Sequence, residues 1–190
     1  MERLTRFILL FIILGMITYC SKIEDDSRSD SIISIDKITA TSTNGETGSI
    51  LYSDVIYKET IINDVAEVQF SNNFINPTVD PTFLNDVVLI RYRVTYKRSD
   101  DRNTPGVDVP YPFDEGMNIK VAANSQSSAG ITIVRAAAKL EKPLIDLRYG
   151  YHEGVISTIA ELEFWGNDLA GRGVYTKGYL EALFANWADD

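Results

Sequence analysis

Apolar and polar positions alternate with a period of two between Val87 and Lys97. Apolar or aromatic side chains occupy the even positions, namely Val88, Ile90, Tyr92, Val94 and Tyr96. Arginine, threonine and lysine occupy the odd positions from 91 onward. Such alternation predicts a β-strand with one face on a hydrophobic core and the other face in water. We therefore expect residues 87–97 to form a central strand whose even positions are buried.

Similar patterns predict further strands on both sides of this one. They cover residues 32–40, 50–57, 65–74, 118–123, 130–141, 155–165 and 174–184. Asn72 and Asn73 suggest a turn, and a change of parity near Ile133 suggests a β-bulge. Roughly seven to nine short strands without a convincing helix predict an all-β fold, an antiparallel β-sandwich around one core.

The last of these segments has two interpretations. Its alternation fits a strand, but its aromatic residues also fit one face of a helix. The preceding Asp168–Gly173 has the composition of a turn between two antiparallel strands, which favours the strand.

The first 20 residues have the features of an export signal. Arg3 and Arg6 precede an apolar run that begins at Phe7, and the segment ends at Cys20, the only cysteine of the chain. About 13 apolar residues are too few to cross a bilayer core of ~30 Å. This arrangement resembles a bacterial lipoprotein signal peptide, and the resemblance implies that Cys20 is acylated and becomes the mature N-terminus. Alternatively, Cys20 is incidental to an ordinary cleaved leader or an uncleaved anchor.

The residues that flank Cys20 refine this picture. Tyr19 stands where lipoprotein signals usually have a small residue. Ser21 follows the cysteine, and by the same resemblance a residue that is not acidic there implies the outer membrane. Residues 21–31 are polar and charged, which predicts a flexible tether before a folded domain at 32–190.

Composition excludes several classes of function. The 190 residues include 18 basic and 27 acidic side chains, a formal net charge of −9, and no segment forms a basic stripe, so we expect no nucleic-acid partner. A single cysteine excludes a disulfide framework. His152 is the only histidine, and its glycine-flanked setting suggests a surface loop rather than a catalytic base or a zinc ligand. We expect no enzymatic activity, no cofactor and no metal.

Residues 99–116 form the longest stretch without a strand pattern, and we predict that they present an interaction surface. Three prolines stiffen the stretch, so it would lose little entropy on binding. Tyr111 and Phe113 would then anchor a partner. Alternatively, both rings fold back onto the sandwich. The aspartates of this loop suggest calcium, but Arg102 lies among them without EF-hand spacing, which favours solvated turns.

Residues 164–172, FWGNDLAGR, resemble the turn before the last strand of bacterial immunoglobulin-like and fibronectin III-like modules, with Arg172 where Asn is usual. Residues 91–113 resemble uncharacterised bacterial lipoproteins that contain such a domain. The resemblance implies an immunoglobulin-like β-sandwich and a non-enzymatic, lipid-anchored envelope protein for protein interaction, adhesion or assembly. The alternative is a carbohydrate-binding module, in which Tyr149 and Tyr151 share strand parity and face a glycan.

Overall fold

The computed structural model describes residues 29–75, 78, 80–149 and 154–187. Cys20, Tyr151 and His152 lie outside these described residues. The strands are β1 (Ser31–Thr41), β2 (Thr47–Gly48), β3 (Ile50–Asp54), β4 (Asp64–Phe74), β5 (Val87–Lys97), β6 (Phe113–Val121), β7 (Ser125–Val134), β8 (Ile156–Asp168) and β9 (Gly173–Ala185). The short helices are η1 (Phe83–Asn85), η2 (Ala136–Leu140) and α2 (Leu144–Arg148). The prediction of an all-β fold is confirmed.

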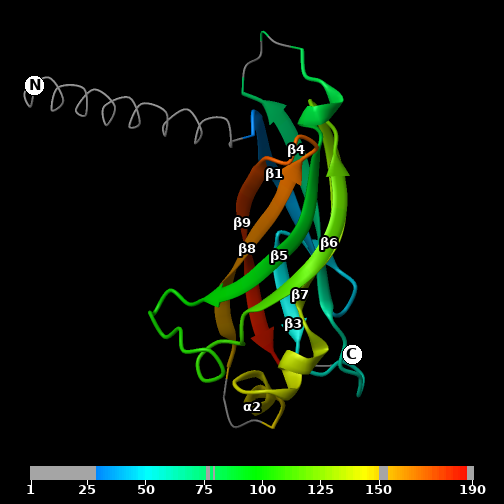
Figure 1. Ribbon diagram of the computed structural model, residues 1–190. Helices are drawn as coiled ribbons and strands as arrows, with labels where there is room; N and C mark the ends of the chain where they lie inside the picture. The colour runs from blue at the N-terminus through cyan, green and yellow to red at the C-terminus, as the bar shows by residue number, and fades with distance from the viewer. Residues whose placement is uncertain (1–28, 76–77, 79, 150–153, 188–190) are drawn as a thin grey trace, which may run out of the picture.

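The strands form two sheets (Figure 1). One sheet has the order β2-β1-β4-β7 and the other has the order β3-β9-β8-β5-β6. β3 pairs with β9 in parallel, whereas the other pairs of described strands are antiparallel. The prediction of a purely antiparallel fold is therefore wrong at this edge, because β3 crosses from the first sheet and runs beside the last strand in the same direction.

Aromatic rings fill the space between the sheets. Phe70 of β4 and Phe164 of β8 meet edge to face, with their ring centroids 5.0 Å apart. Tyr92 of β5 stacks on Phe164 at 6.0 Å. A Cβ on Gly178 would lie 2.9 Å from the Cδ1 of Ile35, so this glycine lets β1 pack closely over β9. Burial of apolar side chains in one shared core holds the two sheets together.

The central strand β5 has the predicted bounds, but its buried parity changes within it. Its register shifts between Leu89 and Arg91 against both neighbouring strands, which is a β-bulge. Leu89 is therefore buried, and Ile90 is 49 % exposed. The predicted burial of Val88 and Ile90 is wrong, whereas that of the even positions from Tyr92 onward is confirmed.

Gly166 of β8 lies opposite this bulge. A Cβ at Gly166 would lie 2.1 Å from the carbonyl oxygen of Val88, closer than any two such atoms can approach. Glycine is therefore required where the bulged backbone of β5 approaches β8.

The predicted strand at 130–141 is wrong in its second half. β7 ends at Val134, and the alanine-rich segment that follows forms η2, with α2 after it. Lys139 of η2 is fully buried and pairs with Asp64, 2.9 Å away. This tertiary contact outweighs the local alternation and turns the chain inward.

Asn72 and Asn73 lie inside β4 and do not form the predicted turn. The buried side-chain amide of Asn72 donates to the carbonyl oxygens of Asn85 and Val121, at 2.9 and 3.1 Å. Asn72 thus ties β4 to η1 and to the last residue of β6, a role that requires a buried polar side chain with donors.

The folded domain includes residues that the sequence assigned to the tether. The hydroxyl of Ser29 donates to Asp168 at 2.7 Å, and Asp30 pairs with Arg172 at 2.7 Å. Ser31 begins β1. The last three residues of the predicted tether therefore belong to the folded domain, and Ser29 and Asp30 pack on the β8–β9 turn.

The predicted strands at the C-terminal end are confirmed. β8 lies between β5 and β9, and β9 runs antiparallel to β8 from Gly173. Of its two interpretations, the last segment is thus a strand.

Candidate functional site

The outer surface of the five-stranded sheet carries a row of aromatic and cationic side chains. Arg91, Trp165 and Tyr175 are direct neighbours across β5, β8 and β9, and we call them the aromatic row. The guanidinium carbon of Arg91 lies 4.2 Å from the centroid of the Trp165 ring. The ring centroids of Trp165 and Tyr175 are 5.6 Å apart. Cross-strand contacts hold these side chains in place on a regular backbone, so they lose little freedom on binding.

Charged side chains surround the aromatic row. Two nitrogens of Arg93 donate to one oxygen of Asp114, at 3.1 and 2.7 Å, and Lys97 pairs with Glu161 at 2.8 Å. The strands contribute five basic and four acidic outward positions: Arg91, Arg93, Lys97, Lys120, Lys177, Asp114, Glu161, Glu163 and Glu181. Asp86 balances the fifth basic side chain, because it pairs with Lys120 at 2.7 Å. This face is therefore neutral, although the whole chain carries a net charge of −9. An acidic partner is repelled less here than by an average surface of the protein.

The hydroxyl of Tyr175 donates to Glu163 at 2.8 Å. This hydrogen bond raises the pKa of Tyr175 above its ordinary value, because the carboxylate stabilises the protonated phenol. The ring is 49 % exposed, and Tyr179, two positions further along the same face, is 53 % exposed. The outer face thus presents tryptophan, tyrosine and arginine, the residue types that dominate the energetics of protein interfaces.

The sequence pattern did not predict the aromatic row, because the row forms only where outward side chains of paired strands meet. Alternation alone predicts which side chains face outward, but not which outward side chains from different strands meet. One signal was present, since a hairpin closed by the turn at 168–173 pairs Trp165 with Tyr175. The third member, Arg91, required the pairing of β5 with β8, which is not local in sequence.

The loop that we predicted as the interaction surface spans residues 98–112, because β6 already begins at Phe113. Phe113 is only 6 % exposed, and its ring packs between Tyr92 and the guanidinium of Arg135. Its prediction as an exposed anchor is wrong, because it belongs to the core. Tyr111 is 51 % exposed, but its ring covers Gly106, where a Cβ would lie 2.3 Å from the phenol oxygen.

The aspartates of this loop pair with arginines. Asp100 accepts from Arg98 at 2.6 Å, and Asp108 accepts from Arg102 at 2.9 Å. The hydrogen bond from Arg98 lowers the pKa of Asp100 to about 2. Within the described ranges, no cluster of three or more histidine, cysteine, aspartate or glutamate side chains is suited to a metal ion.

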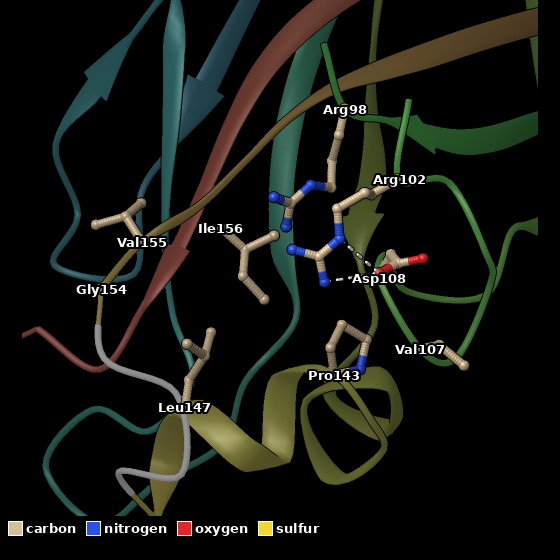
Figure 2. Close-up of a pocket in the computed structure, with 9 residues that line it drawn as sticks. All are labelled: Arg98, Arg102, Val107, Asp108, Pro143, Leu147, Gly154, Val155 and Ile156. Atoms are coloured by element: carbon tan, nitrogen blue, oxygen red, sulfur yellow. Dashed lines mark hydrogen bonds and ion pairs between the residues drawn. The ribbon is translucent and has the colours of Figure 1, made fainter. Parts of the chain in front are cut away.

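A pocket of about 190 Å³ lies beneath the same loop (Figure 2). Arg98 and Arg102 reach across it toward Ile156, and Pro143 and Leu147 form its floor. The positive charges of both arginines are already balanced by carboxylates of their own loop, so the pocket attracts an anion only weakly.

Only one of the two tyrosines that we predicted to face a sugar is described. Tyr149 follows α2 and is 58 % exposed, with the guanidinium of Arg148 5.6 Å from its ring centroid. Tyr151 lies outside the described residues, so their shared face remains a prediction.

A buried polar network links β3, β4 and η2. Both side chains of the Lys139–Asp64 ion pair are 0 % exposed. Asp64 also accepts from the hydroxyls of Thr43 and Ser53, at 2.8 and 2.6 Å. Burial raises the pKa of the Asp64 carboxyl, while the ammonium of Lys139 and the two hydroxyls act in the opposite direction. Because solvent does not reach these groups, we assign the network a structural role.

No protein family matches the sequence, and a search of the curated proteins found no significant match. In the part of the chain that the structure describes, no helix has the length and apolar character to cross a membrane.

Proposed function

We propose that this protein is a non-enzymatic interaction module of the bacterial cell envelope, anchored to the outer membrane by a lipid on Cys20. It binds another envelope protein through the outer face of the five-stranded sheet. The observation that carries this proposal is the aromatic row, in which Arg91, Trp165 and Tyr175 stack across three strands. A preordered group of these residue types on a neutral face has the composition of an interface hot spot.

The strand order supports an immunoglobulin-like type of sandwich. Immunoglobulin-like domains divide their strands into an ABED sheet and a CFG sheet. Here β1, β4 and β7 correspond to strands A, B and E, and β5, β8 and β9 correspond to C, F and G. The aromatic row then lies across strands C, F and G.

The proposed anchor is compatible with this binding face. Residues 21–29 reach at most about 30 Å when fully extended, a distance that keeps the domain close to the bilayer. The described chain begins at Ser29, at the end of the sandwich that contains the β8–β9 turn (Figure 1). The five-stranded sheet runs away from that end, so its outer face is open to a neighbouring protein on the membrane.

Site-specific photo-cross-linking in living cells tests the protein-binding proposal. A photoreactive residue at position 175 should give one discrete adduct, and the Trp165→Ala substitution should abolish it. The same residue at Glu67, which is exposed on the outer face of the other sheet, is the matched control. Identical adducts from both positions, or none from position 175, would contradict the proposal.

A further inference from the structure

We propose that a groove at the opposite end of the sandwich from Ser29 binds a neutral pyranose unit of a glycan. The groove has a volume of about 320 Å³ and is separate from the aromatic row. Its aromatic lining consists of Tyr52 on β3, Tyr57 in the following turn and Trp187 after β9, and its acidic lining consists of Glu46 and Asp54. The inference goes beyond the proposed protein-binding function and does not depend on it.

Two rings form a corner in the groove. The ring centroids of Tyr52 and Trp187 are 5.9 Å apart, and the ring planes meet at 72°. Tyr52 is 42 % exposed. A pyranose has an apolar face of C–H groups and a rim of hydroxyls, so its apolar face can pack on one ring while its rim follows the other.

The groove is built from fixed segments of the chain. An oxygen of the Asp54 carboxylate accepts from the backbone N–H groups of Ile56 and Trp187, both at 3.3 Å, and this holds Trp187 against β3. Tyr57 and Thr60 exchange two backbone hydrogen bonds, at 2.9 and 2.8 Å, around a two-residue turn. These contacts position the rings before any ligand binds, which lowers the entropy lost on binding.

The indole of Trp187 also supplies an unused polar group. Its N–H is buried and donates to no acceptor among the described residues. Buried donors in native proteins are nearly always paired, so this group calls for an acceptor. A sugar hydroxyl oxygen is such an acceptor.

The charges around the groove select against other ligands. The carboxylates of Glu46 and Asp54 disfavour an anion. The ammonium of Lys58 lies 5.0 Å from the centroid of the Tyr57 ring, so a cation already faces one of the three rings. A purely apolar ligand would cover the exposed carboxylate of Glu46 without offering it a hydrogen bond. A neutral ligand with one apolar face and several hydroxyls meets all of these conditions.

Tryptophan fluorescence of the full-length protein tests the groove. The chain contains two tryptophans, so Trp165→Phe leaves Trp187 as the only indole reporter. In this background we expect at least one of maltose, cellobiose, chitobiose and xylobiose to change the emission saturably at millimolar concentration. Tyr52→Ala should weaken that binding by about tenfold, because it removes one wall of the corner. Tyr175→Ala, an exposed tyrosine on the outer face, should leave it unchanged.

Circular dichroism verifies that each variant is folded, and Tyr57→Ala replaces Tyr52→Ala if the latter does not fold. The proposal is overturned if none of the four saccharides changes the emission, or if tetramethylammonium or an acidic peptide saturates the groove instead. Equal weakening by Tyr52→Ala and Tyr175→Ala also overturns it. None of these results affects the cross-linking at position 175, so the two proposals fail independently.

Discussion

At the scale of single residues, the buried lysine in η2 shows how a tertiary contact overrides a local pattern. Lys139 lies within the segment 130–141 that the sequence pattern predicted to be a strand. In the structure its ammonium lies 3.0 and 2.9 Å from the two oxygens of Asp64, with both side chains fully buried. Asp64 lies on β4, 75 residues earlier in the chain, so no local reasoning could pair them.

Lys139→Ala should strongly destabilise the domain. The substitution leaves the Asp64 carboxylate buried without its cation, and we expect the free energy of unfolding to fall by about 3–5 kcal/mol. Urea denaturation monitored by circular dichroism measures this change. Lys142→Ala is the matched control, because Lys142 forms an exposed ion pair with Asp146 and its loss should cost less than about 1 kcal/mol. Comparable losses for the two variants would refute the structural role of the buried pair.

The candidate binding residues were harder to predict than the core. The sequence correctly placed Tyr92, Val94 and Tyr96 in the core because alternation identifies a buried face directly. It proposed Phe113 as an anchor because aromatic residues in a long loop often bind partners, but the start of β6 draws this ring inward. Whether an aromatic side chain is exposed depends on where the next strand begins, and that boundary is set by pairing with β5.

At the scale of elements, local signals predicted hairpins well and long-range register poorly. The β8–β9 hairpin was predicted because its turn and both flanking alternations are contiguous in sequence. The bulge in β5 was missed because it depends on Gly166, which lies far along the chain in β8. The parallel pairing of β3 with β9 was missed for the same reason, since the two strands lie far apart in the sequence and only the complete fold brings them together.

Gly166→Ala tests the close approach of β8 to the bulge. A methyl group at this position would overlap the carbonyl of Val88, so β5 and β8 must separate or the bulge must move. We expect the free energy of unfolding to fall by about 1–3 kcal/mol, or more if the strands cannot adjust. Thermal and urea denaturation measure this change.

Gly130→Ala is the control for that experiment. Gly130 also lies within a strand, but a Cβ there would meet no atom within 4 Å. Gly130→Ala should change the free energy of unfolding by no more than about 0.5 kcal/mol. If Gly166→Ala were equally mild, the bulge would not depend on the missing side chain.

At the scale of the whole molecule, a polar cluster joins the start of the described chain to the β8–β9 turn. Asp168 is 3 % exposed and accepts from the Ser29 hydroxyl at 2.7 Å and from the guanidinium of Arg172 at 2.8 Å. Burial opposes ionisation of Asp168, but these hydrogen bonds outweigh it and lower the pKa of Asp168 below its ordinary value. The ionised carboxylate therefore stabilises the folded state.

The cluster should make stability depend on pH in the acid range. Because the pKa of Asp168 is lower in the folded than in the unfolded state, its contribution is complete above the unfolded pKa of about 3.9. The contribution is lost as the pH falls through the folded pKa. Asp168→Asn should reduce the free energy of unfolding at pH 6. Between about pH 5 and pH 3, the variant should lose less of its stability than the wild-type protein does. Urea unfolding at several pH values measures both effects, and an unchanged slope in the variant would exclude Asp168 as a source of the dependence.

The proposed lipid anchor concerns how the whole molecule meets its surroundings, and it can be tested apart from the fold. The basic residues Arg3 and Arg6, the apolar run and Cys20 predict acylation of the cysteine, so wild-type protein should take up a radiolabelled or clickable fatty acid. Cys20→Ala should take up none and should leave the membrane fraction or remain unprocessed. Tyr19→Ala places a small residue before the cysteine and should speed processing without changing the site of the label. If wild-type protein and Cys20→Ala both remain unlabelled while Tyr19→Ala is labelled, the tyrosine blocks acylation and the natural chain is not a lipoprotein.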